Sequence, residues 1–298
     1  MKKALVLYSG GLDSRLVVRM LQNQDFEVTA LYFALPFGCG CCNLSCSWGF
    51  TQTEEVKMVI QDVNKEPLLS EYLELLKKPE FGTGSGINPC KDCKVYMFKK
   101  AKEYADKHNI EVIATGEVLG QRPMSQVPKA MKTIDEALGF EILRPLSAKV
   151  LEETQFEKKG LVDRTKLLGI VGRGRKKQME LAEKYKIKYP TPGGGCFLCE
   201  KEPSNRLMTL LKKDLITEDT LPLTMIGRHF YINNTWFVVA RNGLESETIS
   251  KFKTHIPDAK GKPSVYYSEQ KGKQKALELQ EAYSTGSEDR EKFEEVKL

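Results

Sequence analysis

The feature that most constrains the fold is an alternation of short apolar runs with amphipathic segments in the first part of the chain. The apolar runs are residues 3–9, 27–37 and 111–117, and the segments with helical spacing are residues 13–24, 51–63 and 94–109. Strands that alternate with helices favour a parallel sheet covered by helices on both faces. We therefore expect an α/β fold with a doubly wound, mainly parallel sheet.

A glycine-containing hexapeptide, "SGGLDS", joins the first apolar run to the first helical segment. Gly10 and Gly11 can adopt backbone angles that other residues avoid, so that loop and helix amides point at one anion. Ser9 and Ser14 add hydroxyl groups, and Asp13 suits a Mg²⁺ ligand or a cap. The motif lacks the lysine of a P-loop. It predicts a phosphate-binding loop at the carboxyl end of a strand.

The positive charge of the chain is concentrated in one segment. The 298 residues carry a net charge of +6, and residues 144–190 contain 13 Lys and Arg against 6 Asp and Glu. This excess suits a polyanion such as RNA, although a solvated helical surface would also explain it. No apolar stretch approaches the roughly 20 residues of a membrane span, and the amino-terminal run is too short for a signal peptide. We expect a cytoplasmic protein with no membrane partner.

A cluster of helix and strand breakers, "YPTPGGGC" at residues 189–196, suggests a domain boundary. We expect a first domain over residues 1–190, a smaller α+β domain over residues 191–268, and a charged helix or tail over residues 269–298. In the small domain, residues 229–242 predict two strands that turn at Asn233 and Asn234. Its aromatic residues could stack on bases, but their alternation favours packing in the core: Phe230, Tyr231 and Trp236.

The eight cysteines fall into three groups, and in a cytoplasmic chain they favour metal binding or catalysis over disulfides. Two groups have C-x-x-C spacing: Cys90 with Cys93, and Cys196 with Cys199. These pairs could bind structural zinc, act as a redox or persulfide pair, or hold an iron–sulfur cluster. The third group could bind a second metal, deliver sulfur or form a thiol-rich loop: Cys39, Cys41, Cys42 and Cys46.

The hexapeptide resembles the signature of the ATP pyrophosphatase (PP-loop) superfamily, whose members split ATP into AMP and pyrophosphate. They adenylate a carbonyl oxygen, which nitrogen or sulfur then displaces. The resemblance implies an adenine nucleotide alpha hydrolase-like fold. It also implies the nucleotide-binding residues: Ser9, Gly10, Gly11, Asp13 and Ser14 for the phosphates, Tyr32 and Phe33 near the adenine, and Gly116 in "ATGE" as a second contact.

Other motifs are similar to those of tRNA thiouridine synthases. Residues 86–121 resemble tRNA 2-thiouridylases, with Cys93 at the position of their catalytic cysteine, although Cys90 is an addition to that pattern. The stretches "GEVLGQRPMSQ" and "LRPLSAK" resemble tRNA 4-thiouridine synthetases. Most of residues 1–255 resembles a group that couples a PP-loop domain to "PTPxGGC" and to a small carboxyl-terminal domain containing "GRHF".

These resemblances imply an ATP-dependent tRNA sulfurtransferase that uses ATP and Mg²⁺. By analogy with cluster-dependent tRNA thiolases, Cys90, Cys93 and Cys196 are the expected ligands of a [4Fe-4S] cluster, with Zn²⁺ as the alternative. Cys199 is then a fourth ligand or a spectator. The expected partners are tRNA and a sulfur donor, either sulfide or the persulfide of a cysteine desulfurase. The oligomeric state stays open, with a homodimer as one option.

Two alternatives remain, a PP-loop enzyme that acts on a small molecule and contains structural zinc, and a nucleotide-regulated RNA-binding protein without catalysis. The expected catalytic residues are Cys93, Asp13 and Lys149. Lys149 could reach the phosphates or the adenylated intermediate, and a role at a helix start would also explain it. Four cations at a predicted helix start oppose the helix dipole, which favours contact with RNA phosphates: Arg173, Arg175, Lys176 and Lys177.

Overall fold

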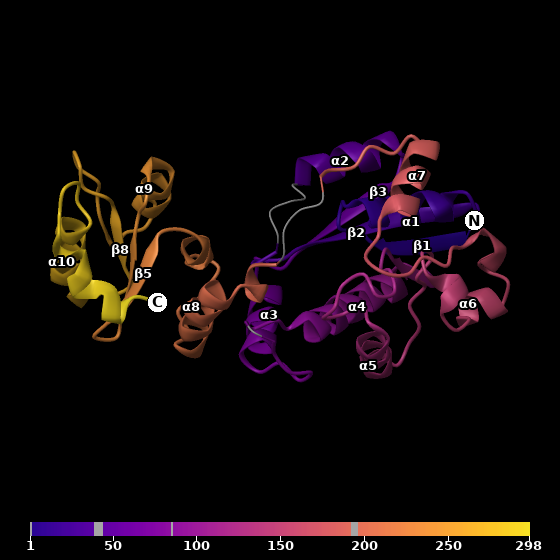
Figure 1. The fold of residues 1–298 in the computed structure, drawn as a ribbon, viewed down its shortest axis with the longest axis horizontal. Coiled ribbons are helices and arrows are strands. Elements are labelled where there is room, and N and C mark those ends of the chain that lie inside the picture. The colour runs from indigo at the N-terminus through magenta and orange to yellow at the C-terminus, as the bar shows by residue number, and fades with distance from the viewer. Residues whose placement is uncertain (1, 39–43, 85, 192–195) are drawn as a thin grey trace. The chain divides into compact units, whose positions relative to one another are not determined.

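The computed structural model describes residues 2–38, 44–84, 86–191 and 196–298 (Figure 1). The chain divides into two compact units, Met1–Glu200 and Lys201–Leu298. Cys39, Cys41 and Cys42 lie outside the described residues, and nothing is described of the Cys46 side chain. No described helix has the length and apolar character needed to cross a membrane.

The first unit contains a parallel sheet of four strands within the described residues. The order across the sheet is β3-β2-β1-β4, and each neighbouring pair runs parallel. The strands are β1 Lys2–Leu7, β2 Phe26–Ala34, β3 Lys57–Asp62 and β4 Val112–Thr115. The chain winds from β1 to β3 in one direction and returns to β4 on the other side of β1. The strand order therefore reverses between β1 and β4. Open α/β sheets bind ligands at such a reversal, outside the carboxyl ends of the strands.

Helices cover both faces of this sheet (Figure 1). They are α1 Leu12–Gln22, α2 Leu44–Thr53, α3 Leu68–Lys77, α4 Cys90–Lys107, α5 Pro128–Leu138, α6 Gln155–Lys158 and α7 Lys176–Lys184. Alternate residues of β1 divide between two cores: Ala4 and Val6 pack with α1, and Leu5 and Leu7 pack with α4 and α5. Side chains alternate in this way because successive strand residues point to opposite faces. The predicted doubly wound α/β fold is confirmed.

The predicted helix over residues 51–63 is wrong, because α2 ends at Thr53 and residues 57–62 form strand β3. Val56, Val59 and Val63 have helical spacing, but the same stretch is rich in β-branched residues. The stretch pairs with β2, with Lys57 opposite Thr29 at one end and Asp62 opposite Ala34 at the other. This pairing supplies the backbone hydrogen bonds that favour a strand. Tertiary context has overridden an ambiguous periodicity.

The second unit has an antiparallel sheet in the order β5-β6-β8-β7. Its described elements are α8 Lys201–Lys212, β5 Arg228–Ile232, β6 Thr235–Val239, α9 Gly243–Ser250, β7 His255–Ile256, β8 Val265–Tyr267 and α10 Lys273–Ala282. The hairpin predicted around Asn233 and Asn234 is confirmed, and both residues have positive φ angles. Phe230 and Trp236 are fully buried, so these two rings pack in the core and are not available to stack on bases.

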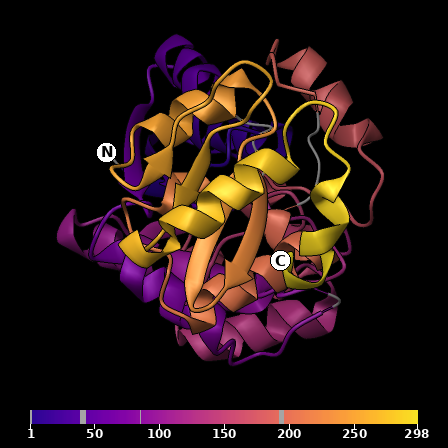
Figure 2. The same cartoon turned by 90° about the vertical axis from the view of Figure 1, so that its left-hand side faces the viewer.

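The end of the chain belongs to the second unit. In Figure 2, α10 lies across the strands, and Ala276 and Leu279 pack with Phe230 and Phe237 of the sheet. Phe293 joins the same core. Residues 269–298, expected as a charged helix or tail, contain the helix α10 and belong to a folded unit. The unit begins at Lys201, whereas the sequence suggested a boundary at residue 190.

Candidate active site

The glycine loop follows β1, at the point where the strand order of the sheet reverses. Gly10 has a φ of +76°, which a glycine adopts without strain. The Ser14 hydroxyl donates a 2.9 Å hydrogen bond to the Gly11 carbonyl, and the Ser9 and Ser14 hydroxyl oxygens are 3.4 Å apart. Helix α1 begins directly after Gly11, so its first amides and both hydroxyls surround one loop. This arrangement suits a phosphate group, and the phosphate-binding roles stay a prediction.

Arg15 holds this loop in place, and its role was not expected from the sequence. Its buried guanidinium donates 2.7 Å hydrogen bonds from Nε to the Gly10 carbonyl and from Nη1 to the Lys188 carbonyl. It also lies 4.7 Å from the centre of the Phe50 ring. The sequence feature that could have indicated this role is an arginine within the apolar stretch of the first helix. Its contacts tie the loop to residues that follow α7.

Asp13 points from α1 toward two glutamines. Its Oδ2 accepts a 2.8 Å hydrogen bond from Gln121 Nε2, and Gln121 Oε1 lies 3.4 Å from Nε2 of the buried Gln178. Burial raises the pKa of Asp13, and the Gln121 hydrogen bond and the charges of Arg175 and Arg122 partly oppose that rise. Asp13 Oδ1 is buried without a hydrogen-bond partner among the described residues. A buried carboxylate oxygen in this position suits a hard cation such as Mg²⁺.

Gly116, expected as a second nucleotide contact, lies against the glycine loop. A side chain at Gly116 would place its Cβ 2.7 Å from the Ser14 nitrogen and 2.8 Å from the Asp13 carbonyl carbon. Glycine is therefore required where the end of β4 meets the start of α1. Tyr32 and Phe33, expected near the adenine, pack against opposite faces of the sheet. Tyr32 shares the face of α1.

The structure brings the two C-x-x-C pairs together. Cys90 and Cys93 begin α4, and the Asn88 amide before them donates a 3.0 Å hydrogen bond to the carbonyl of Leu198, between Cys196 and Cys199. Burial, followed by interaction with Cys199, Cys93 and Cys196, raises the pKa of the Cys90 thiol to about 12. Thiols so close to one another suit a thiophilic ion or cluster.

Two of the four thiols have a further hydrogen-bond contact. Tyr72 of α3 places its hydroxyl 3.5 Å from Cys93 Sγ, and Cys196 Sγ donates to the Phe37 carbonyl at 3.2 Å. Among the described residues, no three His, Cys, Asp or Glu side chains stand in the positions of metal ligands. The residue types therefore fit a metal, and the ligand assignment stays a prediction. Tyr72 lies in a helix that the sequence did not reveal.

A buried charge network connects the cysteine helix to the glycine loop. Glu117, next to Gly116, has Oε2 3.1 Å from Arg144 Nε and Oε1 3.4 Å from Nζ of Lys94, which follows Cys93. Arg144 also forms a bidentate pair with Asp135 of α5. Burial would raise the pKa of Glu117, but Lys94 and Arg144 outweigh it and hold the pKa below its usual value. This network was also missed from the sequence.

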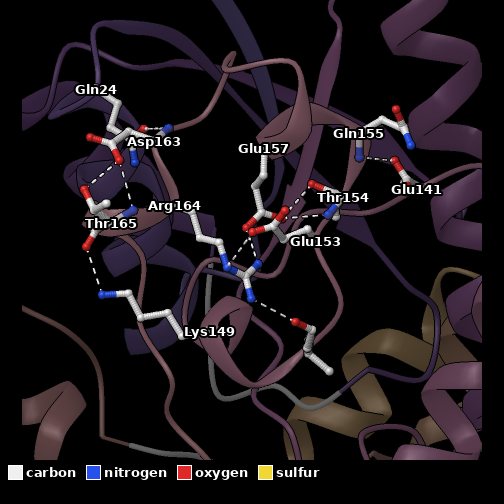
Figure 3. Close-up of polar contacts among 11 residues, drawn as sticks. Gln24, Glu141, Lys149, Glu153, Thr154, Gln155, Glu157, Asp163, Arg164 and Thr165 are labelled. Carbon is white, nitrogen blue, oxygen red and sulfur yellow. Dashed lines mark hydrogen bonds and ion pairs between the residues drawn. The ribbon is translucent and has the colours of Figure 1, made fainter.

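Lys149, expected to be catalytic, lies in a network of loops that follows α5 (Figure 3). Its Nζ donates a 2.9 Å hydrogen bond to the Thr165 carbonyl, and the Thr165 amide and hydroxyl both donate to Asp163. In the same view, Arg164 pairs with Glu157 at 2.6 Å. Among the described residues, the Lys149 hydrogen bond joins two loop segments, and the glycine loop takes no part in it.

The four cations expected to contact RNA lie at the start of α7. Arg173 is exposed, Arg175 precedes the first helical residue, and Lys176 and Lys177 open the helix with exposed side chains. The charge of Arg175 acts on Asp13. The basic segment therefore lies near the glycine loop. By contrast, a cavity of about 640 Å³ near Ile110 and Gln155 contains none of the expected site residues.

Parts of this chain are similar to known proteins. Residues 88–155 match the family model "Thiamine biosynthesis protein (ThiI)". The tRNA-specific 2-thiouridylase MnmA of Clostridium kluyveri is 28% identical over 131 residues, which are 39% of this chain and 35% of that protein. The tRNA sulfurtransferase of Photorhabdus laumondii is 30% identical over 149 residues, 48% of this chain and 28% of that protein.

A crystal structure of a 4-thiouridine synthetase–RNA complex with bound ATP aligns over 75% of this chain and 52% of its own, with a TM-score of 0.45 and 19% identity. The chain spans about a third of the length of the curated relatives it matches. The family model and both relatives confirm the resemblance to tRNA thiouridine synthases that the motifs predicted.

Proposed function

Because this chain is a PP-loop relative of the tRNA thiouridine synthases, we propose that it is an ATP-dependent tRNA sulfurtransferase. One observation carries the proposal. Gly116 touches the glycine loop, and Glu117 beside it binds Lys94, which follows Cys93. Gly116 with the adjacent Glu117, and Lys94 with the adjacent Cys93, thus link the expected phosphate site to the expected cysteine ligands. A nucleotide and a cysteine held by these elements would meet at one edge of the sheet.

The proposed reaction has two steps. A carbonyl oxygen of the base, in a uridine or a cytidine of the tRNA, attacks the α-phosphate of ATP and releases pyrophosphate. Sulfur then attacks the base carbon, and the original oxygen leaves as part of AMP. Ser9, Gly10, Gly11 and Ser14 would hold the phosphates through amide and hydroxyl donors. Asp13 would hold Mg²⁺ through its buried Oδ1.

Cys90, Cys93 and Cys196 would hold a [4Fe-4S] cluster, which supplies a site for sulfide when one iron lacks a protein ligand. The proximity of Cys199 to Cys90 favours the alternative in which four thiolates hold a structural Zn²⁺. In that case no open iron would be present to take up sulfide. The basic start of α7 would contact the tRNA backbone beside the loop. We propose a cytoplasmic location, with sulfide or a desulfurase persulfide as sulfur donor.

The decisive experiment is deletion of the gene followed by mass spectrometry of thionucleosides in total tRNA. Loss of one thionucleoside, restored by the wild-type gene but not by the Asp13→Asn variant, is the expected result. Purified protein with ATP, sulfide and the unmodified tRNA should then release AMP and pyrophosphate in equal amounts. An unchanged thionucleoside profile would instead favour a PP-loop enzyme with a small-molecule substrate.

A further inference from the structure

The second unit contains a cavity of about 300 Å³ whose lining includes four cationic side chains. Arg206, Arg228, Arg241 and Lys297 line it, and Glu202 is the one acidic side chain among its lining residues. These cations come from α8, β5, the segment after β6 and the last residues of the chain. Segments distant in sequence therefore converge on one small volume, at the lower end of the size range of ligand pockets.

Several of these cations are held in fixed positions. Arg206 donates a 3.1 Å hydrogen bond from Nη2 to the Thr224 carbonyl. Arg228 places its guanidinium 5.3 Å from the centre of the Tyr283 ring. Arg241 donates to Glu245 at 2.9 Å from Nε and 2.5 Å from Nη2. Oriented guanidinium groups need little reorganisation to receive an anion.

The wall of the cavity next to these arginines stays uncharged. His229 is buried, accepts a 3.1 Å hydrogen bond from Trp236 Nε1 and lies 2.7 Å from the Ile226 carbonyl through its other ring nitrogen. Burial, with the charges of Arg206 and Arg241, lowers the pKa of His229 to about 3. The imidazole is therefore neutral and donates from Nε2, so it is a fixed structural element of the motif "GRHF". Among the described residues, Glu245 pairs with Arg241 and Glu294 pairs with Lys297, whereas no carboxylate forms an ion pair with Arg228.

The lining favours a negatively charged ligand that does not need to stack on an aromatic ring of the protein. Phe230 and Trp236 next to the cavity are fully buried, so the lining offers no exposed ring face for a base. Arginine forks match the geometry of phosphate oxygens. We propose that this cavity, lined by Arg206, Arg228, Arg241 and Lys297, binds a phosphate group of the RNA backbone. The inference rests on the proposed function, and it assigns the second unit a role in positioning tRNA without reading its sequence.

The test measures the affinity of the full chain for an unmodified tRNA transcript at several salt concentrations. We expect Arg228→Gln and Arg206→Gln each to weaken binding about tenfold. Each should also reduce the slope of log affinity against log salt by about one. Arg290→Gln is the matched control, because Arg290 also stacks on Tyr283, at 5.7 Å, but does not line the cavity. Arg228→Lys should restore the salt dependence, because it keeps the charge, but only part of the affinity, because an ammonium lacks the fork that stacks on Tyr283.

A second measurement tests phosphate binding at the cavity independently of the assignment of RNA as the ligand. Titration with inorganic phosphate should shift the NMR signals of the Arg206 and Arg228 Nε–H groups in the full chain. Shifts without any effect of the variants on tRNA affinity would overturn the assignment to RNA. Unchanged affinity and unchanged signals would overturn the site itself. Thiolation of tRNA by the wild-type protein tests the proposed function separately, and equal thermal unfolding of all variants excludes misfolding.

Discussion

Gln121 Nε2 donates a 2.8 Å hydrogen bond to Asp13 Oδ2, across 108 positions of sequence. The bond fixes one oxygen of the carboxylate and leaves the other buried and available within the glycine loop. Gln178 extends the chain of contacts from Gln121 to α7, the helix that begins with the basic segment. The expected phosphate site and the expected RNA-binding segment are thus joined by amide side chains.

This relationship predicts that Gln121→Leu slows ATP-dependent pyrophosphate release about tenfold, because Asp13 loses a neutral hydrogen-bond donor. The Gln121 hydrogen bond lowers the pKa of Asp13, so its loss raises that pKa further. If ionised Asp13 is required, the acidic limb of the pH–rate profile moves to higher pH. The exposed Gln155 supplies the control variant Gln155→Leu, and an identical profile for Gln121→Leu and wild type would contradict the role of the bond.

The buried Glu117 predicts an acid-sensitive contribution to stability. Its folded pKa lies below the usual 4.5, so the contribution is complete above about pH 4.5 and is lost as the pH falls through the folded pKa. Glu117→Gln should cost about 3 kcal/mol at neutral pH, because Lys94 and Arg144 lose their shared carboxylate.

Urea unfolding at neutral and acidic pH measures this difference, which should shrink on acidification. Glu136→Gln is the control, because Glu136 pairs with Lys132 on the surface at 3.8 Å and should contribute less than about 1 kcal/mol. Equal costs for the two variants would show that the buried network adds no stability.

The cysteine cluster predicts a bound metal. Protein purified without oxygen should be brown from an iron–sulfur cluster, and Ala at Cys90, Cys93 or Cys196 should remove the colour. Cys199→Ala distinguishes the two ligand sets, because a three-cysteine cluster would keep its colour in this variant. Metal analysis of each protein provides the measurement. A colourless wild-type protein that contains one zinc per chain would favour the structural alternative.

His229 predicts that the second unit loses stability on mild acidification. Its folded pKa is about 3 against an ordinary 6.5, so below pH 6.5 the unfolded chain takes up a proton that the folded chain does not. The free energy of unfolding should fall by about 1 to 2 kcal/mol between pH 6.5 and about pH 5.

The NMR signals of the His229 ring should stay those of a neutral imidazole over this range, with Nε2 protonated. His255 is only partly buried and serves as the comparison within the same unit. A His229 signal that titrates near pH 6.5 would refute the prediction.

Local patterns in the sequence determined the elements that depend on residues close together along the chain. The glycine loop after β1, the start of α4 at a C-x-x-C pair, and the hairpin at Asn233 and Asn234 were all readable. Each depends on backbone preferences or on spacing within a few residues. Residues 51–63 were misread because their apolar spacing suits both a helix and a strand.

The tertiary structure decided which distant residues meet. The contacts of Asp13 with Gln121, of Glu117 with Lys94 and Arg144, and of Cys90 with Cys199 arise where β4 and the segment after α7 return to the carboxyl end of β1. The sequence alone identified the residue types of a phosphate loop and a thiol site. Their connection depends on strand order and burial, which no local pattern encodes.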